Sequence, residues 1–350
     1  MIVKNRTVPA VILKMEALLR RLNKQHPKRK EIESDLSKRL AGYKGEQSLD
    51  YYLNQLPYED FIIFHDLRLF AAGCHFQIDT LIISPFFILT IEVKNMSGTL
   101  YFDKDYNQLI RTHNDKEEGF PDPILQSERH RLLLVSWLQL KGFSTLPVEN
   151  LVIVSNPSTI IKSSPDYVIS LERVCHAARL LKRIHEFKEF YNKKMCSPYR
   201  LNRLTHLLLK DHIPLMSDVL SRYKLSEDEV IKGVLCPACH FVMERKQRSW
   251  HCKSCKLPSK YAHLKALEDY FMLLDSSITN VKFRKFLNIE SRHTASNLLS
   301  SLKLPSTGKN KGTIYHQALA SNEPTFTNLR PGYPAQRQLG TSMSAGSTKP

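Results

Sequence analysis

The chain has 350 residues, of which 42% are hydrophobic and 24% charged, which excludes a disordered or fibrous protein and is typical of a soluble globular one. Its 51 Lys and Arg residues outnumber 34 Asp and Glu residues, so the formal net charge is +17 and nucleic acid is the leading expected partner. No apolar run reaches the roughly 18 residues of a spanning helix, and Met1–Arg6 lacks the apolar region of a secretory signal. We therefore expect a cytoplasmic protein with no membrane partner, an anionic membrane being the weaker reading of the charge.

Residues 1–35 are basic and carry apolar residues at helical spacing, which predicts an amphipathic helix packed on the main domain. The helical pattern continues from Leu36 to Leu56. Glu46 falls on the apolar face of that segment, and the neighbouring Gly45 allows close backbone approach. A glutamate on such a face needs a partner, and a salt-bridged edge residue is the commoner outcome.

Two runs rich in β-branched and aromatic residues, at 76–84 and 87–95, predict a β-hairpin. If its turn is centred between Pro85 and Phe86, Asp79 lies opposite Glu92. Opposed residues share one face, with Cβ atoms about 4.5–5.5 Å apart. By the same register Gln77 lies opposite Lys94.

The hairpin therefore places two acids and an amine on one patch of an otherwise apolar element. Opposed carboxylates repel unless a cation lies between them, and Mg²⁺ prefers oxygen ligands of this kind. A neighbouring lysine can orient a water molecule or help to deprotonate it. Asp79, Glu92 and Lys94 are thus candidates for metal-assisted hydrolysis.

The following residues predict further strands and helices. Strands are expected at 99–102 and 108–111, and a helix begins after Asp122-Pro123, with Asp122 as N-cap and Gln126 in the first turn. Residues 151–155 read as a central buried strand, and 171–191 as a basic amphipathic helix. Together these elements predict an α/β sandwich with a mixed central sheet over residues 36–190, followed by a helical linker at 191–230.

Four of the seven cysteines form two CxxC pairs, Cys236/Cys239 and Cys252/Cys255, which points to a reducing compartment and metal ligation. The intervening residues 240–251 suffice for a hairpin that brings the pairs together around one structural Zn²⁺. We expect a zinc ribbon at 231–262. Its basic and aromatic side chains are candidates for nucleic-acid contact: Arg245, Lys246, Arg248 and Trp250. The alternative is a purely structural ribbon, with about even weight.

Helical patterns at 264–274, 282–287 and 292–302 predict a winged-helix-like three-helix module at 263–316, with Ser291 capping the third helix. Its outward residues Arg292, His293 and Asn297 and the loop residues Lys309 and Lys311 are further candidates for nucleic-acid contact. A plain three-helix module that serves protein contacts is the rival interpretation. Residues 317–350 are rich in Ser, Thr, Gly and Pro and are expected to be disordered.

Residues from about Leu36 to Leu181 resemble the nuclease-related domain (NERD) family, which is similar in fold to the restriction-endonuclease-like PD-(D/E)xK nucleases. The resemblance is carried by Gly42-x-x-Gly45-Glu46, Gln77–Ile83, Glu92-Val93-Lys94 with Gly98, and Pro123–Gln126. It implies that Asp79 and Glu92 bind a catalytic Mg²⁺ or Mn²⁺ and that Lys94 positions the attacking water. Glu46 and Gln126 would support that site.

Residue chemistry and resemblance agree on a metal-dependent nuclease acting on DNA, with endonuclease activity favoured. Phosphodiester hydrolysis needs a cation, an activated water and positive charge near the transition state. The alternative is a non-catalytic nucleic-acid-binding or regulatory protein that keeps the sandwich as a scaffold, in which Asp79 and Glu92 are ordinary salt-bridge partners.

Overall fold

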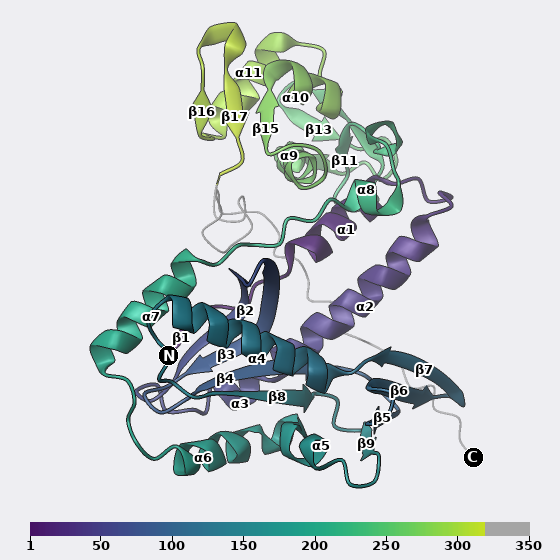
Figure 1. The fold of residues 1–350 in the computed structure, drawn as a ribbon. Coiled ribbons are helices and arrows are strands. Elements are labelled where there is room, and N and C mark those ends of the chain that lie inside the picture. The colour runs from purple at the N-terminus through teal and green to yellow at the C-terminus, as the bar shows by residue number, and fades with distance from the viewer. Residues whose placement is uncertain (319–350) are drawn as a thin grey trace, which may run out of the picture. The chain divides into compact units, whose positions relative to one another are not determined.

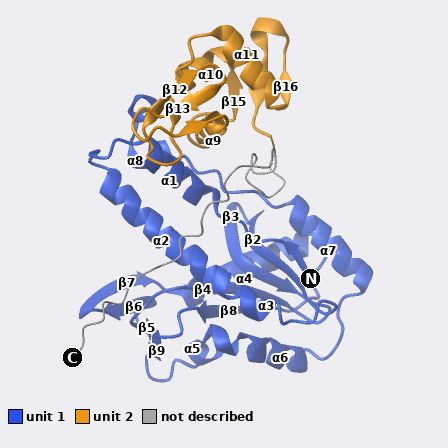
Figure 2. Ribbon diagram, turned by 180° about the vertical axis from the view of Figure 1, so that it is seen from behind, with its two compact units in different colours: residues 1–230 blue, residues 231–350 orange. Residues whose placement is uncertain are grey.

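The computed structural model describes residues 1–318 of the chain (Figure 1). The predicted disordered tail, apart from its first two residues, lies outside this range. The chain divides into two units, residues 1–230 and residues 231–350 (Figure 2). In residues 1–318, no helix combines the length and the apolar character needed to cross a bilayer.

A six-stranded mixed sheet forms the centre of the first unit, in the order β1-β2-β3-β4-β8-β10. Its inner strands are rich in Ile, Leu and Val because both faces of the sheet are covered. The strands are β1 (Ile2–Lys4), β2 (Ile62–Ala71), β3 (Cys74–Ile83), β4 (Ile88–Lys94), β8 (Val148–Val154) and β10 (Val174–His176).

The predicted β3–β4 hairpin and the position of its turn are confirmed, but the expected pairs Asp79–Glu92 and Gln77–Lys94 lie beyond the last paired residues. Thr80 pairs with Ile91 and Ile83 pairs with Ile88, so the turn is centred between Pro85 and Phe86. The Ser84 hydroxyl closes this turn by accepting hydrogen bonds from the backbone N–H groups of Phe86 and Phe87. The β3–β4 ladder ends at the pair Thr80–Ile91, so the neighbouring residue Asp79 has no backbone partner on β4 in this ladder.

Helices cover both faces of this sheet. On one face α4 (Pro123–Leu140) and α7 (Pro198–Lys210) bury Trp137 and Leu204 against β2 and β3, while α3 (Asp50–Leu53) and α6 (Leu180–Phe190) cover the other face (Figure 1). The apolar residues of α7 recur at helical spacing and belong to this core, so the segment predicted as a linker includes part of the first unit's packing.

A second, four-stranded sheet has the order β7-β6-β5-β9. Leu100 and Phe102 of β5 pack on Val152 and Val154 of β8. The predicted strands at 99–102 and 108–111 are confirmed within it. Its strands are β5 (Thr99–Asp103), β6 (Gln108–His113), β7 (Lys116–Pro121) and β9 (Ile160–Ser163).

The N-terminal residues differ from the continuous helix expected over 1–35. Ile2–Lys4 form β1, which pairs parallel to β2, and helices α1 (Ala10–Arg21) and α2 (Arg29–Ser48) follow. Ile2 and Val3 are β-branched and suit an edge strand, and Pro9 directly precedes α1, where its missing N–H costs no helical hydrogen bond. Helix α8 (Val219–Tyr223) and the turn η2 (Glu227–Glu229) complete the unit, α8 lying against α1.

The expected helix over 171–191 is also interrupted. α5 (Val168–Arg173) is followed by β10, the turn η1 (Ala177–Arg179) and α6. Val174–His176 pair with Val152–Val154 because the edge of β8 offers unpaired backbone groups, which outweighs the helical pattern of the side chains.

Up to residue 318, the second unit contains two small antiparallel sheets and three α-helices. The first sheet holds β11 (Val234–Leu235), β12 (Val242–Lys246), β13 (Ser249–His251) and β14 (Pro258–Ser259). The next elements are α9 (Ala262–Leu273), β15 (Ser277–Thr279), α10 (Asn280–Leu287), α11 (Arg292–Ser301), β16 (Ser306–Thr307), η3 (Asn310–Gly312) and β17 (Ile314–His316). The three predicted helices are confirmed, and the Ser291 side chain caps α11 by accepting from the Thr294 N–H.

Candidate active site and candidate zinc site

Lys94, at the end of β4, joins two of the predicted site residues. Its Nζ donates to Glu92 Oε1 at 2.8 Å and to Gln126 Oε1 at 3.1 Å. Glu92 is 6% exposed. The Asp122 carboxylate caps α4 by accepting from the Ile124 N–H at 2.7 Å, which fixes the first turn of the helix and with it Gln126.

Asp79 turns its carboxylate toward β4. Its Oδ2 accepts a hydrogen bond from the Val93 N–H at 2.9 Å, at the point where the backbone ladder has ended. Burial raises the pKa of Asp79 well above its ordinary value, and the negative charges of Glu92 and Glu46 raise it further. The three carboxylates are therefore close enough to disfavour one another's ionisation.

Glu46 reaches the same region from the last turn of α2. Its Oε2 lies 2.7 Å from Arg6 Nη1. Burial raises the pKa of Glu46 to about 7, although Arg6 acts in the opposite direction. Glu46 is thus paired, as an inward-facing glutamate requires, and its partner comes from the segment after β1.

Gly45 sets the approach of α2 to the end of β4. A Cβ on this residue would lie 2.3 Å from Asn95 Cβ and 2.8 Å from Ser155 Oγ, so only glycine fits. Asn95 Nδ2 in turn donates to the Ala41 carbonyl of α2 at 2.7 Å. The helix that carries Glu46 is held against the strand end that carries Lys94.

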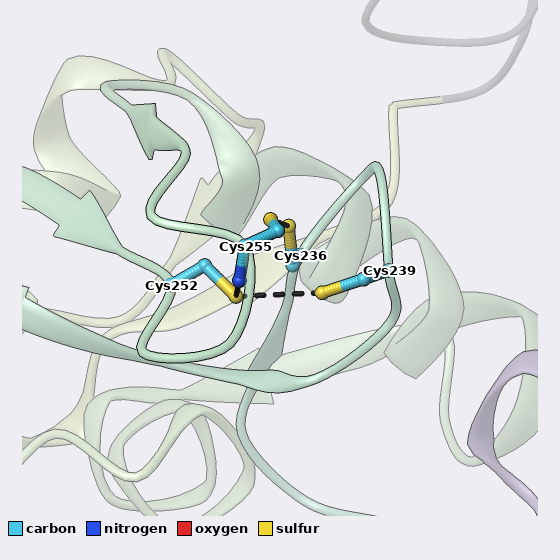
Figure 3. Close-up of side chains that lie close together, drawn as sticks. All are labelled: Cys236, Cys239, Cys252 and Cys255. Atoms are coloured by element: carbon cyan, nitrogen blue, oxygen red, sulfur yellow. Dashed lines mark hydrogen bonds between the residues drawn. The ribbon is translucent and has the colours of Figure 1, made fainter.

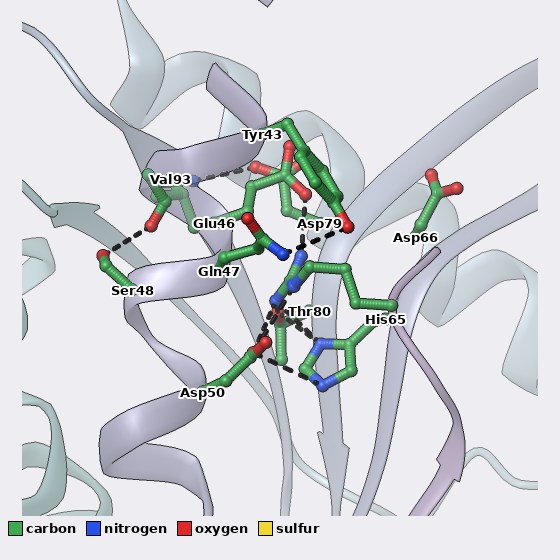
Figure 4. A network of polar contacts seen from close by, with 12 residues as sticks. Tyr43, Glu46, Gln47, Ser48, Asp50, His65, Asp66, Asp79, Thr80 and Val93 are labelled. Atoms are coloured by element: carbon green, nitrogen blue, oxygen red, sulfur yellow. Dashed lines mark hydrogen bonds and ion pairs between the residues drawn. The ribbon is translucent and has the colours of Figure 1, made fainter. Parts of the chain in front are cut away.

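Arg6 is a site neighbour that the sequence analysis did not single out. Its side chain is 4% exposed and contacts Glu46, Asp50 (3.2 Å), His65 Nδ1 (2.9 Å) and Thr80 Oγ1 (3.2 Å), as Figure 4 shows for the residues around it. A single arginine within a basic segment that is expected to be helical carries no distinguishing pattern. The nearby Ile2-Val3 pair, with its strand propensity, is the signal that could have placed it beside the sheet.

His130 on α4 is a second neighbour of the site. It is buried, and its Nδ1 lies 3.7 Å from Glu92 Oε2. Burial lowers the pKa of His130, while Glu92 raises it. A neutral imidazole beside Glu92 can help to position that carboxylate without adding a full positive charge.

The donor set of this cluster suits a hard divalent cation. Asp79 and Glu92 offer carboxylate oxygens, and a cation between them would relieve the repulsion that raises the pKa of Asp79. Lys94 lies beside this pair and can donate hydrogen bonds to a water or phosphate oxygen. The arrangement can support water-dependent cleavage of an anionic ester.

The four cysteines of the second unit converge (Figure 3), and within residues 1–318 they are the one group of three or more potential metal ligands whose ligand atoms all lie within 4.8 Å of one another. Sγ atoms are 3.5 Å apart for Cys236 and Cys255 and 3.4 Å apart for Cys239 and Cys252. In a tetrahedral site with Zn–S bonds of about 2.3 Å, sulfur atoms lie about 3.8 Å apart, so the thiols fit a zinc ion.

The two CxxC turns have matching backbone geometry. In the first turn the Cys236 N–H donates to the Phe241 carbonyl and the His240 N–H donates to the Cys236 carbonyl. In the second turn the Cys252 N–H donates to the Leu257 carbonyl and the Lys256 N–H donates to the Cys252 carbonyl. His240 and Lys256 both have positive φ, near 60°. Such repeated turns are consistent with a zinc ribbon.

The structure separates the predicted nucleic-acid-contacting residues by exposure. Trp250 is 1% exposed and donates to His263 Nδ1, so it forms part of the core of the second unit and cannot stack on a base; that expectation is wrong because the small sheet needs an apolar filler. Arg245 is half-buried above the Trp250 ring. The remaining candidates have exposed side chains: Lys246, Arg248, Arg292, His293, Asn297, Lys309 and Lys311.

Comparisons with known proteins locate a family domain in the first unit. Neither the search of curated proteins nor the search of solved structures gave a match. A family model described as NERD, nuclease-related domain, matches residues 41–155. This range contains Glu46, Asp79, Glu92, Lys94 and Gln126. Residues 41–155 of the first unit are therefore similar in sequence to the nuclease-related domain family.

Proposed function

We propose that the protein is a metal-dependent nuclease that hydrolyses phosphodiester bonds of DNA, with internal cutting favoured. The observation that carries the proposal is the joint position of Asp79, in the middle of β3, and of Glu92 and Lys94, at the end of β4, inside the matched domain. The mixed sheet between helical layers supports a restriction-endonuclease-like sandwich as the scaffold.

Asp79 and Glu92 would hold a Mg²⁺ or Mn²⁺ ion. When bound, such an ion supplies positive charge that polarises a phosphoryl oxygen and lowers the pKa of a coordinated water. Lys94 orients the attacking water with its ammonium N–H groups. Its position is fixed by hydrogen bonds to Glu92 and Gln126, so Lys94 need not reorganise during the reaction.

Glu46 contributes a third carboxylate to the patch. Arg6 holds it in place from the opposite side. Glu46 would accept a hydrogen bond from water near Asp79, and Arg6 limits the repulsion that this third acid adds to the cluster.

The second unit would bring the enzyme to its substrate. The order of α9, β15, α10, α11, β16 and β17 supports a winged-helix-like module, with Arg292, His293 and Asn297 on the exposed face of α11. Lys309 and Lys311 lie in the loop between β16 and β17, where a wing would contact the phosphate backbone. A zinc ion held by the four cysteines would stabilise the adjoining ribbon.

The second candidate function is a non-catalytic nucleic-acid-binding protein. The ion pair between Lys94 and Glu92, 2.8 Å long and mostly buried, is the observation that favours it, because such a pair also occurs as a structural salt bridge. In that case the patch needs no divalent ion.

Incubation of the full chain with covalently closed plasmid and with single-stranded RNA, in Mg²⁺ or Mn²⁺, tests the proposal. Wild-type protein is expected to nick or linearise the plasmid, and Asp79→Ala and Lys94→Ala to reduce this at least 100-fold. Lys104→Ala, which changes an exposed lysine outside the patch, is the matched control.

The outcomes separate the two functions. Cutting of closed circles that depends on Asp79 and Lys94 supports an endonuclease. Plasmid binding without cutting by any form supports the scaffold. Equal cutting by wild type and both variants would assign the activity to a contaminant and overturn the proposal.

A further inference from the structure

A pocket of about 480 Å³ opens at the edge of the large sheet, apart from the acidic patch. Its walls come from β9, β10, η1 and the first turns of α6. Ile161, Val174 and Cys175 form much of the apolar part, and burial raises the pKa of the Cys175 thiol to about 11, so this thiol remains a neutral wall. The volume is in the range that accommodates a small organic ligand.

The polar residues that line this pocket are His176, Arg179 and Lys182, with no carboxylate among the lining residues. The side chains of Arg179 and Lys182 make no hydrogen bond or ion pair with other residues in the range 1–318. His176 Nδ1 is buried and has no hydrogen-bond partner there. The nearby Glu186 is paired with Arg183. The pocket therefore combines an apolar floor with unused cationic and hydrogen-bonding groups.

The register of the sheet relates this pocket to the acidic patch. Lys94 pairs with Val154, and Val154 pairs with His176, all in parallel ladders. Partners in a ladder point to the same face, so His176 lies on the face that carries Lys94. Two strand spacings place their Cα atoms roughly 10 Å apart.

Val154 itself is buried beneath Leu100 and Phe102 of β5, so a nucleic-acid strand that joined the two sites would pass over the loop that follows β8. β8 ends at Val154 and continues into Ser155-Asn156-Pro157-Ser158, which carries hydroxyl and amide groups only. Ser155 and Asn156 are half-buried, and Pro157 and Ser158 are exposed.

We propose that this pocket is a nucleotide subsite: Arg179, Lys182 and His176 bind a phosphate of the nucleic-acid strand within a few nucleotides of the bond that is cut, and the apolar floor receives its base or sugar. This inference rests on the proposed nuclease function and adds a site to it. The shared chemistry is a phosphate joined to an apolar ring system, so a free nucleotide is the other possible source.

Binding of a fluorescein-labelled 20-base-pair DNA to the full chain, followed by anisotropy, tests the subsite. Lys94→Ala is present in every form to prevent cutting. Arg179→Ala and Lys182→Ala are each expected to weaken binding roughly tenfold and to lower the salt dependence by about one phosphate contact. Ala178→Phe keeps the charges but fills the pocket from an exposed position, and is expected to weaken binding by a similar factor.

Lys162→Ala is the matched control. Lys162 is exposed and follows Ile161 on β9, but does not line the pocket, so its loss removes the same charge nearby. An effect below twofold for this control supports the subsite. If Arg179→Ala and Ala178→Phe behave like Lys162→Ala, the subsite is overturned while the nuclease function stands.

Competition with dAMP separates the two sources of the ligand. If millimolar dAMP displaces the DNA from the parent form but not from Ala178→Phe, the pocket binds a nucleotide within the strand. If dAMP binds but Ala178→Phe leaves DNA affinity unchanged, the pocket serves free nucleotides and the strand assignment is wrong. Absence of DNA binding by every form overturns both the subsite and the proposed function.

Discussion

Arg6 Nη1 lies 2.7 Å from Oε2 of Glu46, so the segment that follows β1 is joined by a largely buried ion pair to the helix that enters the acidic patch. The guanidinium is 4% exposed and the Glu46 side chain 24%. Removal of one member of such a pair leaves the other without compensation, which costs more than the pair itself contributes. The basic N-terminal segment is therefore part of the first unit, joined to the helix that carries Glu46.

Arg6→Met is expected to destabilise the first unit by about 2–3 kcal/mol, less than a fully buried pair because Glu46 retains some solvent. Urea unfolding measures the change. In a Glu46→Gln background the same substitution should cost at least 1 kcal/mol less, since the half-buried Glu46 charge is then absent and only the ion pair with Asp50 is lost. Lys38→Met, an exposed residue of α2, is the control and should change stability by less than about 0.5 kcal/mol. Equal costs of Arg6→Met in both backgrounds would show that the pair carries no coupling.

Gly45 and Gly42 give a matched pair of substitutions on one helix. Alanine at 45 places its Cβ 2.3 Å from Asn95 Cβ, whereas nothing lies within 4 Å of a Cβ at 42. Gly45→Ala should therefore lower the free energy of unfolding by about 1–3 kcal/mol through overpacking and reduce nuclease activity by displacing Glu46 and Asn95. Gly42→Ala should instead stabilise the helix by up to about 1 kcal/mol. Thermal unfolding of both variants checks the signs, and a stabilised, fully active Gly45→Ala protein would contradict the close packing.

The elements nearest the site were the most predictable from sequence. The alignment of β3 with β4 could be predicted from the position of their turn, because the alternation of side chains between the two faces allows few alignments once the turn is placed. The α4 boundary followed from Asp122-Pro123, whose capping chemistry is local. The side-chain hydrogen bond from the Val93 N–H to Asp79 was not predictable, because it depends on where the backbone ladder ends.

Errors occurred where tertiary pairing outweighs local pattern. β10 interrupts a helical sequence because the edge of β8 is available, and β1 is only three residues long. β2 was not predicted at all, although Ile62–Ala71 is rich in Ile, Phe and Leu; its half-buried polar residues, including Asp66 and Arg68, obscured the alternation. Trp250 was misassigned because an aromatic residue in a basic loop has the same sequence appearance whether it fills a core or faces a ligand.

Because His65 is buried, we expect the free energy of unfolding to fall in acid. Its Nδ1 accepts a hydrogen bond from Arg6, and burial, with the charges of Arg6 and Lys4, lowers the pKa of His65 to about 3. In the unfolded chain this histidine is protonated near pH 6.5, whereas in the folded chain it stays neutral at that pH. Stability from the neutral ring is therefore complete above pH 6.5 and is lost as the pH falls from 6.5 toward 3.

Urea unfolding at pH 7.5 and pH 5.0 measures this effect. Between these values wild-type protein should lose about 2 kcal/mol more than His65→Gln, in which the titrating ring is absent. His185→Gln, at an exposed histidine of α6, should follow the wild type. A His65→Gln protein with the same pH dependence as wild type would show that this histidine is protonated without cost in the fold.

The four cysteines predict one tightly bound zinc ion per chain. Cys236 and Cys252 are almost fully buried, and the strands around them are two to five residues long, so the small sheet has little apolar core of its own. Metal ligation would supply the missing stability, on the order of 10 kcal/mol of apparent binding energy for structural sites. Cys236→Ser or Cys252→Ser should abolish zinc in elemental analysis and increase amide exchange over residues 232–260. Cys74→Ser, which changes an exposed thiol of the first unit, should keep both the zinc and the protection. Protein that contains no zinc yet retains slow exchange across this segment would rule out the metal as its stabilising element, since the remaining contacts would then suffice.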